Sequence, residues 1–167
     1  MIELYATPTP NGQKVMIMLE EIGLAWQHID VNIRTGEQFS AEHLKRSPNN
    51  KIPAIVDTEG PGGSYTMMES GAILIYLAEK TGDEYTIAGM AVYPWVKGYA
   101  DRRIDKADHP RFMRWLEAME ARPAVRRNNT MTTEIRARMN KAAEGKPPVN
   151  IYDTKDNAER LAKATGS

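Results

Sequence analysis

Two short stretches of the sequence combine residue types that suit the binding of a small acidic peptide. Ile52 and Pro53 stand between a polar loop and an apolar, mostly β-branched run over 54–56, where an X-Pro bond is a candidate for the cis form. Proline cannot donate to a sheet ladder and belongs at a strand start, so the Ile52 backbone is an edge that an extended peptide could join. Glu69 and Ser70 then open an apolar helix. We expect Ser70 to be its N-cap, with N–H groups beside it that favour an anion.

The same residues also have an ordinary structural explanation. Ser70 could simply cap the helix, and Glu69 could be a first-turn acid favoured by the helix dipole. We favour ligand binding because Pro53 stands at the start of the neighbouring strand. If Ser70 and Glu69 served only to cap the helix, a proline at that strand start would not be required.

Composition limits the chemistry that the protein itself can supply. None of the 167 residues is cysteine, so any thiol chemistry must use a thiol from a ligand. The three histidines are too scattered to indicate a metal site. The 22 basic and 22 acidic residues balance, and the polar end of the chain has no aromatic residue apart from Tyr152, which argues against nucleic-acid binding. No apolar run approaches the roughly 18 residues of a membrane span.

The first 82 residues predict alternating strands and helices. Apolar periodicity and turn residues indicate these elements in order: strand 2–6, helix 13–22, strand 26–31, short helix 41–45, strands 54–57 and 65–68, and helix 70–80. A strand, helix and strand in succession favour a parallel, right-handed unit. The βαβ-α-ββα order predicts a thioredoxin-like α/β domain.

The second half predicts helices only. A helix is expected over about 85–103, and another begins at His109-Pro110 and ends at Arg122-Pro123. Residues 128–167 are polar and poor in large apolar side chains, so we expect a weakly structured tail. The chain is thus divided into a first domain over 1–82, a helical segment over 83–127 and this tail.

Three motifs carry a family resemblance. Ser-Pro-Asn-Asn-Lys-Ile-Pro-Ala-Ile-Val-Asp over 47–57 and Glu-Ser-Gly-Ala-Ile-Leu-Ile-Tyr-Leu-Ala over 69–78 resemble the glutathione-binding half of a cytosolic glutathione transferase. Thr-Pro-Thr-Pro-Asn-Gly over 7–12 is similar to the opening of the nu class, the YfcG-like bacterial proteins related to the yeast Ure proteins. The resemblance covers residues 1–82 without a gap.

The resemblance implies glutathione as co-substrate and gives each part of it a partner. Glu69 would take the γ-glutamyl ammonium, while Ser70 and the helix start would take its carboxylate. Ile52, before Pro53, would pair by its backbone with the cysteinyl residue. Gln38 and Lys51 would reach the glycyl carboxylate, although Lys51 could equally be an ordinary solvated lysine.

The resemblance also places the thiol near Thr9 and Asn11, where other classes use Tyr, Ser or Cys. A helix N-terminus with hydroxyl and amide donors lowers a thiol pKa, and the thiolate is the nucleophile. By spacing alone, these residues are better explained as a turn with an Asn cap. Tyr5 is an alternative hydroxyl, but strand alternation puts it beside Glu3.

The second half departs from the family pattern. Residues 85–95 look like the family's late helical motif, yet they follow directly after 80–82, so the earlier helices are expected to be absent. Those helices build the family's dimer interface and one wall of its second-substrate pocket, so any homodimer would need a non-standard interface. Three residues after the expected cap Thr86, this chain has Gly89 where the family usually has an acidic residue, and this change removes the capping box.

The leading hypothesis is a cytoplasmic glutathione-dependent enzyme acting on a small electrophile or disulfide. Similarity to the nu class implies disulfide or peroxide reduction with weak conjugation, and no metal. Two glutathione molecules could supply both sulfurs, which agrees with a chain without cysteine. The alternative is a catalytically weak glutathione-binding or protein-interaction module that remains after loss of the helices.

Overall fold

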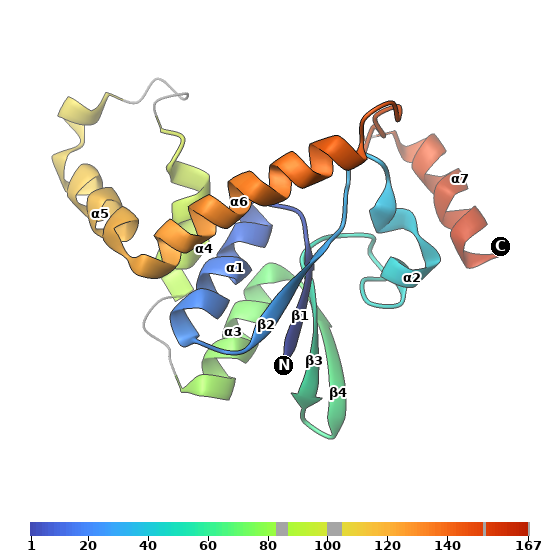
Figure 1. Ribbon diagram of the computed structural model, residues 1–167, viewed down its shortest axis with the longest axis horizontal. Coiled ribbons are helices and arrows are strands. Elements are labelled where there is room, and N and C mark those ends of the chain that lie inside the picture. Colours follow the sequence, from blue (N-terminus) through green and yellow to red (C-terminus); the bar gives the residue numbers. More distant parts are fainter. Residues whose placement is uncertain (83–86, 100–104, 152, 167) are drawn as a thin grey trace.

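The first half of the chain forms one mixed four-stranded sheet (Figure 1). The computed structural model describes residues 1–82, 87–99, 105–151 and 153–166. The strands are β1 (Ile2–Ala6), β2 (Trp26–Asp30), β3 (Ala54–Gly60) and β4 (Gly63–Met68), in the order β2-β1-β3-β4. β1 pairs parallel to β2 and antiparallel to β3, which pairs antiparallel to β4. The predicted thioredoxin-like α/β class is confirmed.

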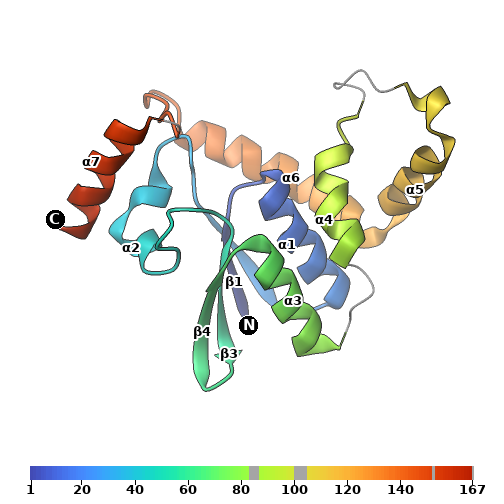
Figure 2. The same ribbon diagram turned by 180° about the vertical axis from the view of Figure 1, so that it is seen from behind.

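Helices cover this sheet on both sides. They are α1 (Pro10–Ile22), the short 3-10 helix η1 (Glu37–Phe39), α2 (Ala41–Leu44) and α3 (Ser70–Thr81). α1 and α3 lie side by side against one face, and α2 lies beyond the other (Figures 1 and 2). The main core forms between the sheet and the apolar sides of α1 and α3, because both helices carry large aliphatic residues at helical spacing.

Helix α1 begins three residues earlier than its apolar pattern predicts. Thr9 is its N-cap, with the hydroxyl accepting a hydrogen bond from the N–H of Gly12 at 3.3 Å, and Pro10 occupies the first helical position, where proline is tolerated. A Cβ on Gly12 would lie 2.2 Å from the carbonyl oxygen of Thr7. Only glycine therefore lets the loop before Thr9 pack so closely on the helix.

The second half is helical throughout its described parts. Its helices are α4 (Ile87–Val96), the short 3-10 helix η3 (Lys106–Asp108), α5 (Pro110–Ala121), α6 (Pro123–Ala142) and α7 (Thr154–Thr165). α4 and α6 pack directly against α1. The expected cap Thr86 lies outside the described residues. Within the described part of the chain, no helix is long and apolar enough to cross a membrane.

The prediction of a weakly structured tail from residue 128 is wrong. α6 crosses the expected boundary, and its buried residues after that point recur at helical spacing: Asn128, Thr132, Ile135 and Met139. Two of these four are polar, which is why a search for large apolar residues overlooks this face. Farther along, α7 packs near η1, and the N–H of Val149 donates to the carbonyl of Arg34 at 2.8 Å.

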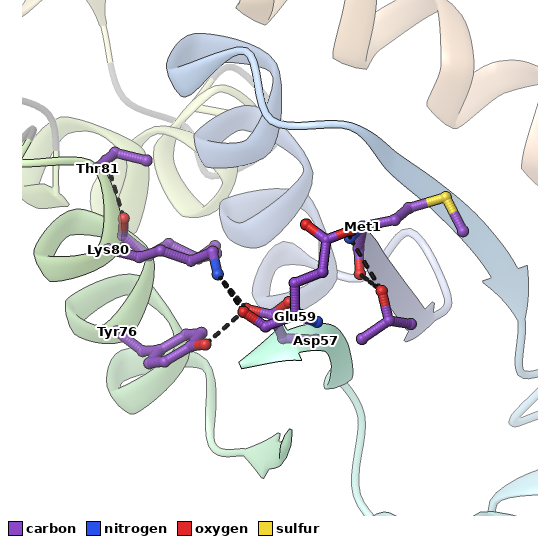
Figure 3. A network of polar contacts seen from close by, with 8 residues as sticks. Met1, Asp57, Glu59, Tyr76, Lys80 and Thr81 are labelled. Atoms are coloured by element: carbon purple, nitrogen blue, oxygen red, sulfur yellow. Dashed lines mark hydrogen bonds and ion pairs between the residues drawn. The ribbon is translucent and has the colours of Figure 1, made fainter. Parts of the chain in front are cut away.

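A buried carboxylate fixes α3 on the sheet (Figure 3). Asp57 of β3, whose side chain is 0% exposed, accepts hydrogen bonds from the Tyr76 hydroxyl at 2.6 Å and the backbone N–H of Glu59 at 2.9 Å, and pairs with Lys80 at 2.8 Å. Burial alone would raise the pKa of Asp57, but these partners outweigh it and lower that pKa. These contacts hold the middle and the last turn of α3 on the sheet.

Candidate functional site

Five of the eight predicted site residues line one cavity of about 290 Å³. The cavity lies at the start of α1, between that helix, η1 and the loop before β3. The predicted residues that line it are Thr9, Asn11, Gln38, Lys51 and Ile52. Residues that we did not predict complete it, among them Ile33, Phe39, Asn50, Trp95 and Ile151. The tertiary structure thus brings together predicted residues that lie up to 43 positions apart in the sequence, from Thr9 to Ile52.

The backbone of Ile52 has the unpaired character that the sequence suggests. The Ile52–Pro53 bond is cis, as predicted, and β3 begins only at Ala54. Among the described residues, no hydrogen bond uses the N–H or the carbonyl of Ile52. Both groups are therefore available to an extended ligand that runs along this edge.

Glu69 and Ser70 lie beyond this cavity, next to Pro53. β3 and β4 pair Ala54 with Met68, so continuing this register puts Glu69 opposite Pro53. Ser70 is not the N-cap as predicted: the cap position belongs to Glu69 at φ 73°, and Ser70 is the first helical residue. The strand runs into the helix without an intervening turn, so Glu69 itself must reverse the backbone.

This helix start is open and has no side-chain cap. Among the residues that the structure describes, no side chain accepts a cap hydrogen bond at the start of α3, and a Cβ on Gly71 would meet nothing within 4 Å. The first N–H groups of the helix therefore face an accessible space in which a carboxylate would be favoured. A left-handed conformation at a residue such as Glu69 is costly, and such residues cluster at functional sites.

Gln38 contributes a buried polar group without a partner. Its side chain is 3% exposed, and its Oε1 atom accepts no hydrogen bond from the described residues. Lys51 is exposed, and its carbonyl is held by the His43 ring at 3.0 Å while its N–H donates to Ser47 at 3.2 Å. A buried acceptor left unpaired costs about 1–3 kcal/mol, so a ligand N–H or O–H donor would stabilise the Oε1 atom of Gln38.

Thr9 and Asn11 lie at the positive end of the α1 dipole. The Asn11 carbonyl oxygen accepts a hydrogen bond from Lys14 at 2.8 Å, and the same ammonium lies 5.7 Å from the ring centre of Trp95. Burial lowers the pKa of Lys14. A thiolate near Thr9 would thus meet a helix N-terminus with a lysine ammonium nearby, and both favour the anion.

Tyr5 does not line this cavity. Its hydroxyl donates to Glu3 at 2.8 Å, and Arg46 covers its ring with 4.2 Å between the guanidinium carbon and the ring centre. Strand alternation therefore placed Tyr5 correctly, beside Glu3.

The helical half of the chain holds the loop before α1. Lys97, which follows α4, donates to Gln13 and to Asn129 of α6, and Gln13 donates to the carbonyl of Pro8 at 3.0 Å. Burial, followed by the charge of Arg136, lowers the pKa of Lys97. The Thr7–Thr9 loop is thus positioned by contacts from both halves.

Sequence reasoning missed the walls that come from distant segments. Trp95 lies within the motif over 85–95, so the resemblance contained a signal for it. Ile151 lies in a short stretch without helical or strand periodicity, and no local pattern marks it. In the part of the chain that the structure describes, no group of three His, Cys, Asp or Glu residues could hold a metal ion.

Comparisons with known proteins show which family this chain resembles. The family model for the glutathione S-transferase N-terminal domain matches residues 1–79. The disulfide-bond oxidoreductase YfcG of Escherichia coli is 32% identical, over 75% of this chain and 93% of the relative. A glutathione transferase family member from Pseudomonas fluorescens, solved with two glutathione bound, has a TM-score of 0.70 at 31% identity and covers 76% of this chain and 91% of its own.

A third similar protein was solved with a disulfide. The glutathione transferase from Pseudomonas putida, with one glutathione disulfide bound per subunit, has a TM-score of 0.69 at 30% identity, over 77% of this chain and 90% of its own.

The alignment with the Escherichia coli protein contains a large gap. It runs over 199 residues, whereas 75% of this 167-residue chain is about 125 residues. About 74 aligned positions, the difference between these two lengths, therefore have no counterpart in this chain.

Proposed function

This chain belongs to the glutathione S-transferase family, and from that premise we propose that it binds glutathione and uses its thiolate to reduce disulfides or peroxides, with weak conjugation of electrophiles. The observation that carries the proposal is the cavity that joins Thr9, Asn11, Gln38, Lys51 and Ile52. Its ligand-facing groups are those that an acidic, thiol-bearing tripeptide requires.

In this proposal the tripeptide lies along the edge before β3. The γ-glutamyl ammonium meets Glu69, and its carboxylate meets Ser70 and the open start of α3. The cysteinyl backbone pairs with Ile52, next to the cis bond to Pro53. The glycyl carboxylate accepts from the side-chain N–H groups of Gln38, not from its Oε1 atom, and from the ammonium of Lys51.

The thiol then lies near Thr9 and Asn11, where the α1 N-terminus favours the thiolate. With a disulfide substrate, this thiolate attacks one sulfur, the substrate S–S bond breaks, and the leaving thiolate takes up a proton. A second glutathione thiolate attacks the mixed disulfide and releases the other substrate thiol. Two glutathione molecules are oxidised to glutathione disulfide, and the substrate disulfide is reduced to two thiols.

The proposal extends to the arrangement of the chain. Residues 1–82 would form the binding domain, and the following helices a shortened helical domain that includes α6. A homodimer would have to form by a non-standard interface, and exposed apolar side chains such as Ile75 of α3 and Val92 of α4 are available for it. We propose the cytoplasm as its location because glutathione is kept reduced there.

The gap in the alignment favours a second candidate from another class. Loss of about 74 aligned positions could leave a glutathione-binding or protein-interaction module with little turnover. Turnover with hydroxyethyl disulfide and glutathione separates the two candidates, because the module would bind glutathione without reducing the disulfide.

The first experiment is isothermal titration with glutathione and with glutathione disulfide. Ser70→Ala should weaken binding about 10-fold or more, since a hydrogen bond to a charged group is worth about 1.5–3 kcal/mol. Ser64→Ala, an exposed serine of β4 that lines none of the cavities described, is the matched control and should bind normally. Sedimentation in the same buffer reports the oligomeric state. A folded wild-type chain that binds neither ligand would overturn the proposal.

A further inference from the structure

A second cavity, of about 320 Å³, lies on the other side of Thr9. Thr9 and Ile33 border both cavities, so the second one opens next to the position proposed for the thiol. Its remaining lining comes from the loop before Thr9, from the segment after β2 and from the last turns of α6. This cavity is built by α6, which places Arg136, Met139 and Asn140 in its wall.

Two guanidinium groups border this cavity without a neutralising charge. Arg34 donates to the side-chain oxygen of Asn140 at 2.8 Å, and Arg136 donates to the carbonyl of Pro8 at 3.1 Å. Neither forms an ion pair with any described residue. Arg138 lies on α6 like Arg136, but its charge is neutralised because it forms a two-point ion pair with Asp30.

The other polar groups of the wall are already occupied. The Asn32 side chain donates to the Met139 carbonyl at 3.0 Å and accepts from the Arg34 N–H at 3.1 Å, and the Thr7 hydroxyl lies 2.8 Å from the Met139 sulfur. No acidic side chain is among the lining residues in the described part of the chain, although Glu37 accepts the N–H of Asn32 at 2.7 Å. The cavity therefore combines neutral walls with two cationic groups.

We propose that this cavity binds the non-reacting part of an acidic second substrate, with Arg136 and Arg34 as the residues that recognise its carboxylate. The inference rests on the proposed function, because the shared border at Thr9 would put a disulfide bound here within reach of the glutathione thiolate. Guanidinium groups bind carboxylates with directional, charge-assisted hydrogen bonds. Acidic disulfides should therefore be reduced in preference to neutral disulfides of the same size.

The test compares 3,3′-dithiodipropionate, which carries two carboxylates, with hydroxyethyl disulfide, which is neutral and of similar length. Turnover of both with glutathione is measured on the full chain for wild type, Arg136→Gln and Arg126→Gln. Arg126 is an exposed arginine of the same helix whose guanidinium donates to the Glu120 carbonyl outside both cavities, so it is the matched control. The glutathione Kd is measured in parallel.

Arg136→Gln should lower the ratio of kcat/KM for the acidic over the neutral disulfide about 10-fold, whereas Arg126→Gln should leave it unchanged. The glutathione Kd should not change, since Arg136 does not line the first cavity. An equal loss for both substrates would mean that Arg136 acts only by holding Pro8, and would overturn the inference. An unchanged ratio would also overturn it.

A direct titration keeps this result separate from the proposed function. If the wild-type chain binds no glutathione, titration with 3,3′-dithiodipropionate still tests the cavity. Binding that Arg136→Gln weakens about 10-fold relative to Arg126→Gln would support the acidic site without the enzyme. Equal affinities, or no binding to wild type, would overturn it.

Discussion

The Gln38 side chain leaves a buried acceptor unpaired in the unliganded fold, and in the proposed function its N–H groups donate to the ligand. It is 3% exposed, and its Oε1 atom has no hydrogen-bond partner among the described residues, yet it lines the cavity beside Lys51. An apolar residue of similar size would remove this unpaired group. Stability and binding should therefore respond to substitution in opposite directions.

We predict that Gln38→Leu weakens glutathione binding about 10-fold, because the glycyl carboxylate loses a donor. The free energy of unfolding should be unchanged or higher by about 1 kcal/mol. Titration calorimetry and urea unfolding of the same samples test both parts. A variant that binds normally would remove Gln38 from the site, and one that unfolds more easily would show that the amide has a structural partner.

Thr9 caps α1, and in the proposed function its hydroxyl also donates to the thiolate, so the two roles must be separated. Thr9→Ala should raise the pKa of the bound glutathione thiol and lower turnover at pH 7 about 10-fold, while loss of the cap costs about 1 kcal/mol of stability. Thr9→Ser, which keeps the hydroxyl, is the control. Thiolate absorbance against pH measures the pKa, and equal curves for the three proteins would limit Thr9 to capping.

At the scale of elements, the site depends on how α3 is joined to the sheet. The buried carboxylate of Asp57 accepts a hydrogen bond from Tyr76 and forms an ion pair with Lys80, both on α3 (Figure 3). Burial, together with the hydrogen bond to Asp57, raises the pKa of Tyr76 to about 12. The register that puts Glu69 opposite Pro53 is thus supported by contacts about two and three turns farther along the helix. We expect these contacts to affect both stability and binding.

Asp57→Asn should cost about 2–4 kcal/mol at pH 7, since it leaves Lys80 without its ion-pair partner and with only the Glu59 carbonyl. Because the folded-state pKa of Asp57 is lowered, its stabilisation is complete above the unfolded pKa of about 3.9 and is lost as the pH falls through the folded value. The variant should therefore lose less stability than wild type on acidification below about pH 4.

Urea unfolding at pH 7 and at about pH 3 measures this difference. Glu79→Gln, an exposed acid on the same helix, is the control and should stay within about 0.5 kcal/mol of wild type. If both variants behaved alike, the network around Asp57 would not be what holds α3.

At the scale of the whole molecule, α6 joins the two halves. It packs along α1, and Arg122 immediately before it forms a two-point ion pair with Glu21, at 2.7 and 2.8 Å. Near its other end, the Met139 carbonyl accepts from Asn32. These contacts make α6 part of the folded unit and put its last turns beside the second cavity.

Ile135→Ala should therefore lower the free energy of unfolding by about 2–4 kcal/mol, as expected for a buried aliphatic side chain. Thr133→Ala, at an exposed position of the same helix, should change it by no more than about 0.5 kcal/mol. Thermal and urea unfolding provide the measurement. A neutral Ile135→Ala would mean that α6 is not packed on the rest of the chain.

The sequence by itself determined the features that depend on near neighbours. The cis bond at Ile52–Pro53, the strand start after it and the order of elements over 1–82 follow from local backbone chemistry and apolar periodicity. Ser70 was assigned to the wrong cap position because the conformation of Glu69 depends on how β4 meets α3. That junction is set by strand pairing rather than by residue type.

Only the tertiary structure decided what closes the cavities. Trp95 and Ile151 complete the first one, and Arg136 of α6 borders the second, although none of these side chains is near Thr9 in the sequence. Their positions depend on the docking of α6 and α4 on α1 and of the last segment near η1. Helix docking is a sum of many weak contacts over long sequence separations, which no local pattern records.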